Sequence, residues 1–186
     1  GMAECALAIS FEELDVGITS IQVDKDSMSR EGLVKPLDDK DVDGLNSLTF
    51  VDCGKILPSF EIAIRDDAGG DLPDYQCGRI CLRGPSVMTG YFQNPTATDE
   101  SLSKEGWLDT GDIGYRVGDN VIVTARRKDV IIVNGRNIWP HDLEYLAETL
   151  PGVRFGNVSA FSFADEAGSD QVVMVVESRE SNPAKV

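Results

Sequence analysis

The amino-acid sequence predicts a mixed α/β fold in which β-structure dominates, and two observations support this. In the middle of the chain, short apolar runs alternate with turn residues. Within Glu61–Arg65 and Gly78–Arg83, apolar side chains recur at every second position, as in half-buried strands. After Ala125 the pattern becomes that of one helix among strands, in the order β-α-β-β, which is typical of a small α+β domain. We therefore predict two domains, residues 1–125 and residues 126–186.

Local signals define the other elements. Pro140 suits the first turn of a helix that carries apolar residues at helical spacing, and Pro151-Gly152 ends that helix. A second helix is expected after Pro95, with Thr96 or Thr98 as its N-cap and acidic residues in its first turn. The remaining strands are predicted at Val121–Thr124 and Val130–Val133, joined as a hairpin by the basic cluster between them, and at Phe155–Phe163 and Gln171–Glu177.

Charge and hydropathy limit the class of partner. The segment from Gln22 to Asp43 is dense in charged residues, so we expect an exposed excursion or insertion without regular structure. The formal net charge of the chain is −15, which argues against a nucleic-acid partner or an anionic membrane surface. No apolar run reaches the length of a membrane span, and no signal-peptide pattern opens the chain. We expect a cytoplasmic location.

The cysteines and the single histidine argue against metal and triad chemistry. The spacing of Cys5, Cys53, Cys77 and Cys81 matches no zinc site, because a second close pair is missing and His141 is distant. We expect structural thiols in a reducing compartment. A single histidine also excludes a multi-histidine metal site and argues against a Ser-His-Asp triad.

A carboxylate on a glycine-bounded loop is the most informative motif. Gly106–Asp112 places Asp112 at the end of such a loop, and Arg126–Gly135 adds a basic cluster and a short apolar strand. A carboxylate accepts two hydrogen bonds from a vicinal diol such as ribose, and a downstream Arg can donate to the same sugar or its phosphate. In so acidic a chain, a nucleotide would need Mg²⁺ or local donors. The alternative is a surface Asp in a turn beside a solvated basic hairpin, and these residues alone leave both readings open.

Four sequence blocks occur in a fixed order along nearly the whole chain. They are Gly1–Glu4, Gly78–Phe92 followed by Asn94-Pro95 and Thr98, Gly106–Asp112, and Arg126–Gly135 followed by Asp142–Glu144. This series resembles the adenylate-forming superfamily of acyl-CoA synthetases, luciferases and adenylation domains of peptide synthetases. Within it, the long charged stretch after Glu4 and the run Val133–Glu144 resemble fatty-acyl-AMP ligases. The resemblance implies a distorted β-barrel belonging to a large AMP-binding domain (1–125), then, after a hinge, an incomplete small α+β domain (126–186).

The resemblance also implies a reaction and its residues. Such enzymes adenylate a fatty or other carboxylic acid with ATP and Mg²⁺, mainly by positioning and charge neutralisation, and pass the acyl group to CoA or to a carrier protein's phosphopantetheine. Glu4 is implied as the Mg²⁺ ligand. Lys128 is implied as the hinge about which the small domain swings between adenylation and thiol transfer. The residues implied to contact ATP or AMP are Asp112 and Arg126 at the ribose, Thr110 and Gly111 in the loop before Asp112, and Met2, Ala3 and Gly135.

Other parts of the resemblance find no match in these residues. A phosphate-binding loop, an acyl tunnel and a C-terminal catalytic Lys are missing, so we expect a piece truncated at both ends that is inactive by itself. Apolar surface left exposed by truncation would favour a homodimer. A different class of function also stays open, namely a non-catalytic remnant that serves as a binding or interaction module.

Overall fold

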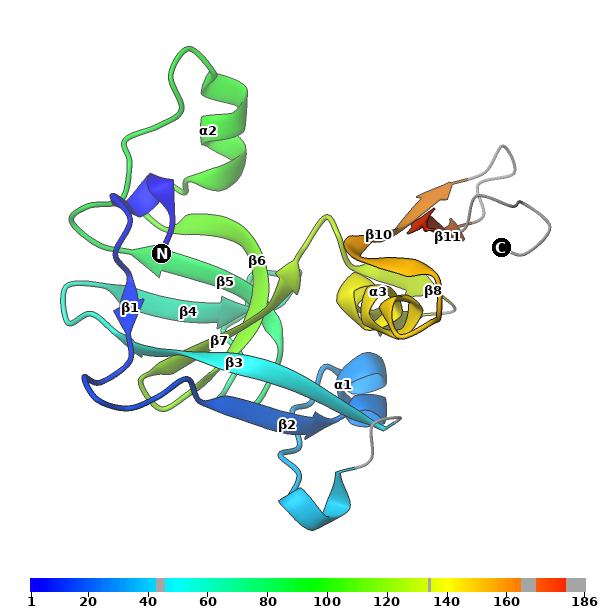
Figure 1. Ribbon diagram of the computed structural model, residues 1–186. Coiled ribbons are helices and arrows are strands. Elements are labelled where there is room, and N and C mark those ends of the chain that lie inside the picture. Colours follow the sequence, from blue (N-terminus) through cyan, green and yellow to red (C-terminus); the bar gives the residue numbers. More distant parts are fainter. Residues whose placement is uncertain (43–45, 134, 165–169, 180–186) are drawn as a thin grey trace. The chain divides into compact units, whose positions relative to one another are not determined.

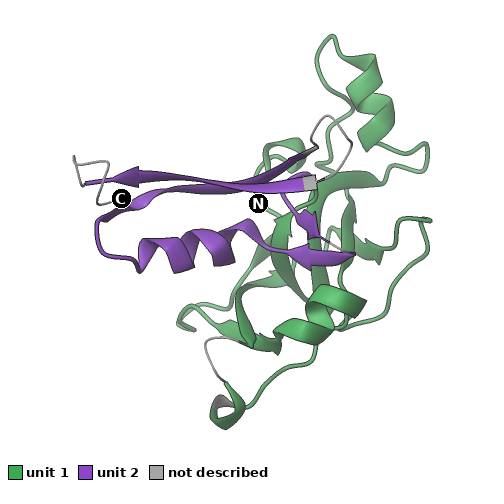
Figure 2. Ribbon diagram, turned by 90° about the vertical axis from the view of Figure 1, so that its right-hand side faces the viewer, with its two compact units in different colours: residues 1–127 green, residues 128–186 purple. Residues whose placement is uncertain are grey.

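The computed structural model describes residues 1–42, 46–133, 135–164 and 170–179, and it divides into two compact units, Gly1–Arg127 and Lys128–Val186 (Figure 2). The predicted mixed α/β fold, rich in strands, is confirmed. In chain order the elements are η1 (Ala3–Cys5), β1 (Ser10–Phe11), β2 (Ser20–Asp24), α1 (Lys25–Glu31), η2 (Asp39–Asp41), β3 (Ser47–Ile56), β4 (Glu61–Arg65), β5 (Gly78–Arg83), α2 (Pro95–Ser101), β6 (Leu108–Val117), β7 (Asn120–Arg126), β8 (Ile131–Val133), β9 (Arg136–Ile138), α3 (Pro140–Glu148), β10 (Val153–Ala164) and β11 (Asp170–Ser178) (Figure 1).

One antiparallel sheet forms the frame of the first unit. Its strands follow the order β1-β3-β7-β6-β5-β4, with β2 paired to β3 beside β1 (Figure 1). The expected distorted barrel is therefore not closed within the described residues, because β4 pairs only with β5 and β1 pairs only with β3. With two residues, β1 is too short to close the barrel by pairing with β4 at the opposite edge of the sheet.

The core of the first unit lies against the middle strands of this sheet. Ile80, Cys81 and Leu82 of β5 are all buried, so this strand is covered on both faces. Both β4 and β5 have the predicted bounds, but the half-buried alternation predicted for them is wrong, because adjacent residues are buried in each strand: Ala63 and Ile64 in β4, and Ile80 to Leu82 in β5. The main cluster of buried side chains comprises Cys5, Ile9, Phe60, Ile64, Ile80, Leu82, Leu108 and Val121.

The segment from Gln22 to Asp43 is folded, so the expectation of an exposed excursion without regular structure is wrong. It contains most of β2, all of α1 and η2, and the fully buried Val23 and Met28 (Asp43 lies outside the described residues). Asp24 caps α1 by accepting a hydrogen bond from the Ser27 N–H at 2.8 Å. The charged residues mask three buried apolar residues, Val23, Met28 and Val34, which are too few to produce a recognisable period, and tertiary packing orders the segment.

Two local predictions were also wrong. Strands β7 and β8 do not form a hairpin: β7 pairs with β6 and β3, and β8 pairs with the unpredicted β9. The N-cap of α2 is Asn94, whose Oδ1 accepts from the Ala97 N–H at 3.1 Å, and no acidic residue lies in the first turn. Thr98 instead accepts from the Tyr91 N–H at 2.9 Å.

The second unit contains two hairpins and one helix. The strands β8 and β9 form the first hairpin, β10 and β11 form the second, and α3 begins at Pro140 as predicted. Side chains of α3 cap strand backbone, because Glu144 accepts from the Ala160 N–H at 2.9 Å and Glu148 accepts from the Gly156 N–H at 2.7 Å. Along the chain, the elements of the second unit follow the order β-β-α-β-β, with β9 added to the predicted β-α-β-β order.

All four cysteines are free thiols. Burial raises the pKa of Cys77 to about 11 and also raises the pKa of Cys5 and Cys81, which keeps these thiols protonated at neutral pH. Across the described residues, no helix has both the length and the apolar character that crossing a membrane demands.

If α1 is an integral part of the first unit, Met28→Ala should lower the free energy of unfolding by roughly 2–4 kcal/mol, since it deletes a fully buried side chain. Urea denaturation measures this. Leu14→Ala is the control, because Leu14 is 93% exposed and its loss should change stability by less than about 0.5 kcal/mol. Equal small effects from both variants would contradict the packing of α1.

Candidate functional site

A bulge in β6 creates the most distinctive backbone feature of the first unit. Asp109 pairs with Cys81 of β5, whereas Ile113 pairs with Arg79, so three residues of β6 lie opposite a single residue of β5. Gly111, within the bulge, adopts a φ of 72°, which favours glycine. Bulges of this kind re-aim side chains next to functional sites.

Thr110 fastens the bulge to the sheet. Its buried Oγ1 donates to the Ile80 carbonyl oxygen at 2.9 Å and accepts from the Asp112 N–H at 3.1 Å. The hydroxyl is thus used within the protein, and its role in this geometry is to shape the loop. Gly111 contributes through its backbone conformation.

Asp112 and Arg126 are brought together. They are direct cross-strand partners of β6 and β7, and the Arg126 Nε lies 2.9 Å from the Asp112 Oδ1. The Asp112 side chain is 20% exposed and the Arg126 side chain is 57% exposed. Burial raises the pKa of Asp112 and the nearby Glu4 carboxylate adds to the rise, while Arg126 opposes it.

Glu4 lies near Asp112, and these two residues, together with Arg126 and Tyr91, are called here the Asp112 cluster. Within it, Glu4 has a partner that was not predicted. The Tyr91 hydroxyl donates to the Glu4 Oε1 at 3.1 Å, and the Met88 N–H donates to the Glu4 carbonyl oxygen at 2.7 Å. Burial raises the pKa of Tyr91, and so does the hydrogen bond to Glu4. Tyr91 lies in one of the four ordered sequence blocks, but its role cannot be read from that motif, since its contact with Glu4 spans 87 positions.

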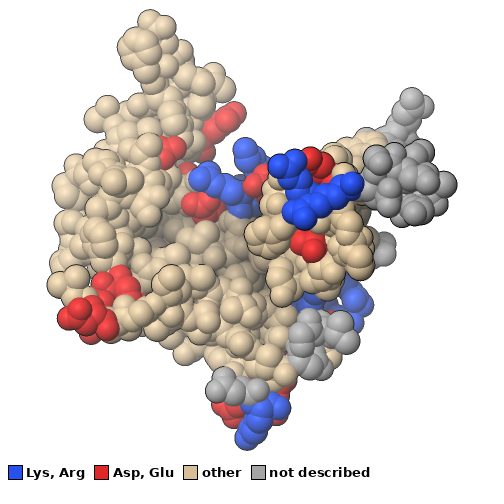
Figure 3. All heavy atoms as spheres, viewed as in Figure 1, with Lys and Arg blue, Asp and Glu red and all other residues tan. Residues whose placement is uncertain are grey.

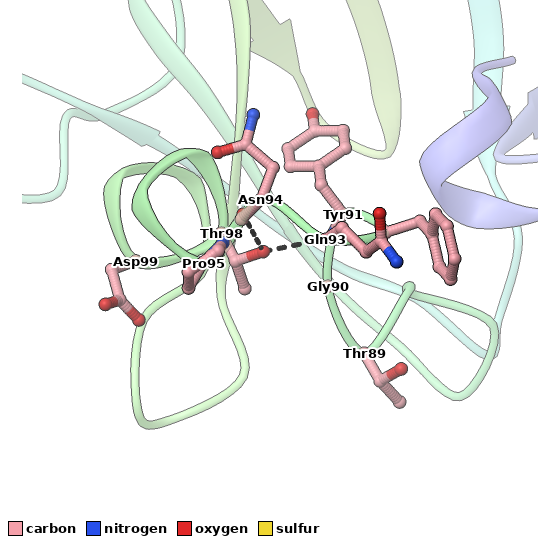
Figure 4. Close-up of a pocket in the computed structure, with 9 residues that line it drawn as sticks. Thr89, Gly90, Tyr91, Gln93, Asn94, Pro95, Thr98 and Asp99 are labelled. Carbon is pink, nitrogen blue, oxygen red and sulfur yellow. Dashed lines mark hydrogen bonds between the residues drawn. The ribbon is translucent and has the colours of Figure 1, made fainter.

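Two hollows border the Asp112 cluster. A pocket of about 530 Å³ is formed by the loop before α2 and the start of that helix, where Tyr91, Asn94 and Thr98 lie together (Figure 4). A smaller cavity of about 100 Å³ has Asp112, Thr110 and Met2 in its wall, with apolar side chains of several strands around them. Asp112 therefore sits at the boundary between a polar cluster and an apolar cavity.

The remaining predicted residues divide between the two units. Ala3 begins η1, next to Glu4. Lys128 is exposed and is the first residue of the second unit. Gly135 adopts a φ of 73° between β8 and β9, also in the second unit. The cluster around Asp112 is therefore built from the first unit alone.

The charged groups of this protein suit a bound cation only in part. Among the described residues, no group of three or more His, Cys, Asp or Glu side chains could hold a metal ion. Mg²⁺ commonly binds through one or two carboxylates together with phosphate oxygens of a nucleotide, so Glu4 fits as a single ligand and not as part of a complete cage. On the face shown in Figure 3, several groups of basic side chains lie beside acidic ones.

Comparison with known proteins gives consistent matches. Residues 14–92 match the family described as AMP-binding enzyme. A putative acyl-CoA synthetase of Caulobacter vibrioides is 42% identical over 180 residues, covering 96% of this chain and 31% of that protein. The long-chain-fatty-acid–AMP ligase FadD32 of Mycobacterium marinum is 32% identical over 181 residues, covering 87% of this chain and 28% of the relative.

A solved structure agrees with these relatives over the full chain. It comes from work on fatty acyl-adenylate ligases of E. coli and L. pneumophila, has a TM-score of 0.84 and 37% identity, and is matched by 100% of this chain over 32% of its own length. This chain thus spans about a third of the proteins it matches. The ordered motifs, the sequence matches and the shared fold together show that the chain belongs to the adenylate-forming, AMP-binding enzyme superfamily.

Proposed function

We propose that this chain supplies the ribose-holding part of an adenylation site, in an enzyme that converts a fatty or other carboxylic acid and ATP to an acyl-AMP and pyrophosphate. The observation that carries the proposal is the pairing of Asp112 with Arg126 across β6 and β7 at 2.9 Å. One acceptor and one donor, held side by side with the acceptor in the wall of a cavity, suit the two hydroxyls of a ribose.

The two side chains keep capacity for a ligand. The Asp112 Oδ1 and the Arg126 Nε form an ion pair at 2.9 Å. Within the described part of the chain, no hydrogen bond joins the Asp112 Oδ2 or the Arg126 Nη atoms to another protein group. Asp112 can accept from a sugar hydroxyl while Arg126 donates to a sugar or phosphate oxygen. Thr110 and Gly111 set the backbone before Asp112, and Met2 lines the adjoining cavity.

Glu4 is the residue proposed to face Mg²⁺. When bound with ATP, this ion would neutralise phosphate charge, which a protein of net charge −15 needs for an anionic substrate. Tyr91 holds one carboxylate oxygen of Glu4 through its hydroxyl and so limits the orientations that the carboxylate adopts.

We further propose a thiol as the acyl acceptor, on CoA or on a phosphopantetheine carrier protein, with Lys128 as the hinge. Support comes from the division of the chain between Arg127 and Lys128. Gly135 would lie in the turn that serves thiol transfer. Between the two branches we favour a fatty-acyl-AMP ligase, because the segment from β2 to η2 is folded and anchored by Val23 and Met28, as an insertion that restrains domain movement would need to be.

The ribose assignment predicts a selective loss of nucleotide affinity. Asp112→Ala and Arg126→Ala should each weaken AMP binding by roughly ten- to one-hundredfold, because each removes a charge-assisted hydrogen bond. The wild-type chain should also bind 2′,3′-dideoxy-AMP less tightly than AMP. A chemical-shift titration by NMR measures these affinities even when they are weak.

Arg127→Ala is the matched control for this titration. Arg127 neighbours Arg126, has a similarly exposed side chain at 53% and pairs with Asp67 instead. It should leave AMP affinity unchanged. Equal losses from both arginine variants would indicate a general charge effect and would remove the support for a ribose site.

The ionised carboxylate of Asp112 should lower the stability of the folded protein at neutral pH. Because its folded-state pKa lies above the ordinary value, stability from this group is present when the carboxyl is protonated and is lost as pH rises through the folded pKa. Asp112→Asn should therefore be at least as stable as wild type at neutral pH, with the difference shrinking in acid. Thermal denaturation across pH tests this, and a clear destabilisation by Asn at neutral pH would contradict it.

These 186 residues by themselves should form no acyl-AMP. They span about a third of their relatives, and their candidate site contributes one cation, Arg126, near the nucleotide. Each missing donor to the transferring group is worth about 3–4 kcal/mol of transition-state stabilisation. A coupled pyrophosphate assay with ATP, Mg²⁺ and a fatty acid should give the rate of a blank without protein, and a rate above the blank would contradict this prediction.

A further inference from the structure

An ion pair outside the proposed ribose site lies next to the bulge of β6. The Arg79 Nη1 is 2.6 Å from the Asp109 Oδ2, and both side chains are largely buried, at 18% and 22% exposure. Arg79 is itself held in place, because its Nε and Nη2 donate to the Asp66 carbonyl oxygen at 3.3 and 2.9 Å. A pair fixed in this way acts as a rigid support, unlike a mobile surface ion pair.

The second oxygen of this carboxylate binds the bulge directly. The Asp109 Oδ1 accepts from the Gly111 N–H at 3.0 Å. This N–H belongs to the residue with positive φ. Asp109 therefore restrains the Thr110–Gly111 peptide, one unit before the Gly111–Asp112 peptide.

Gly111 also connects the two halves of the proposed ribose site. Its carbonyl oxygen accepts from the Arg127 N–H at 2.8 Å, so one glycine is bonded to the neighbour of Arg126 and is itself the neighbour of Asp112. A shift of Gly111 would move the Asp112 carboxylate and the Arg126 guanidinium relative to each other. Small displacements of this kind weaken binding strongly, because the hydrogen bonds to a ligand depend on geometry.

A second ion pair in the same sheet shows what an ordinary cross-strand contact looks like. Glu61 and Arg83 lie directly opposite each other on β4 and β5 and bond at 2.9 and 2.6 Å. Their side chains are 61% and 40% exposed, and Glu61 bonds no part of the bulge. Pairs of this type contribute little to stability, and the further contact of Arg83 is with the Trp107 ring, 4.8 Å from its centroid.

We propose that Asp109, anchored by Arg79, is a positioning residue that fixes the Gly111 N–H and thereby sets Asp112 in the geometry opposite Arg126 that receives a ribose. The assignment rests on the proposed function for its ligand, while the restraint on Gly111 can be measured without any ligand. Asp109 acts through Asp112 and does not itself touch the nucleotide.

The first test measures the restraint in the free chain. Amide hydrogen exchange, followed by NMR, should be faster at the Gly111 N–H in Asp109→Ala and Arg79→Gln than in wild type. Exchange in the cores of β5 and β7 should stay close to wild type. Glu61→Ala is the matched control and should leave Gly111 unchanged. Unaltered exchange at Gly111 in Asp109→Ala would overturn the proposal.

The second test measures AMP affinity in a double-mutant cycle. Asp109→Ala should weaken AMP binding on the order of tenfold in the wild-type background but have almost no further effect when Asp112 is already Ala, since the two act through one contact. Asp109→Asn should recover most of the affinity, because its Oδ1 can still accept from Gly111. Independent, additive losses would show a merely structural role and would overturn the proposal.

The two failures can be told apart. If Asp112→Ala leaves AMP affinity unchanged, or the wild-type chain shows no AMP-dependent shifts, the ribose assignment is wrong and the positioning proposal loses its ligand with it. If Asp112→Ala weakens binding but Asp109→Ala does not, the ribose site stands and only the role of Asp109 is refuted.

Discussion

The candidate site depends on one cross-strand register, in which Asp112 of β6 lies directly opposite Arg126 of β7. Because side chains alternate along a strand, a slip of one residue would turn one of the two to the other face of the sheet. Gly114 restricts that slip: a Cβ at this position would lie 2.2 Å from the Ile122 carbonyl oxygen, so only glycine allows β6 and β7 to approach this closely. The bulge before Asp112 then turns its carboxylate toward Arg126 without breaking the pairing of the rest of the strand.

Charge is unevenly balanced around this register. Two carboxylates, Asp112 and Glu4, lie close enough that Glu4 contributes to the raised pKa of Asp112, and Arg126 is the cation that offsets them. Burial of Asp112 adds to the same effect, so the folded protein holds this carboxylate in an environment less favourable than water. Functional sites commonly carry such local costs, and a ligand that brings hydroxyl donors and a divalent cation would relieve both.

The periodicity of the sequence predicted the bounds of single elements, but it did not predict which strands pair with one another. The bounds of β4 and β5 and the start of α3 follow from alternation and from Pro140, and the structure has them as predicted. The sequence cannot show that β7 pairs with β6 and β3 instead of with β8, because adjacent apolar runs read as a hairpin whether or not they pair. The order within β2 and α1 was missed for a related reason, since Val23 and Met28 become visible as anchors only once the sheet beneath them exists.

The same division applies to the site. Asp112 and Arg126 could be nominated because their motifs are contiguous and belong to a recognisable ordered series. Tyr91 and Arg79 could not, because each acts through a contact between distant segments: Tyr91 reaches Glu4 across 87 positions and Arg79 reaches Asp109 across 30. Such contacts exist only after the sheet has set the strand order, so no spacing rule in the sequence encodes them. The residues that bind a ligand can therefore be recognised in a sequence while the residues that hold them in place cannot. Asp109 shows why, because its carboxylate bonds both Arg79 and the Gly111 N–H. Its effect is produced by the pairing of β5, β6 and β7 and not by its own motif.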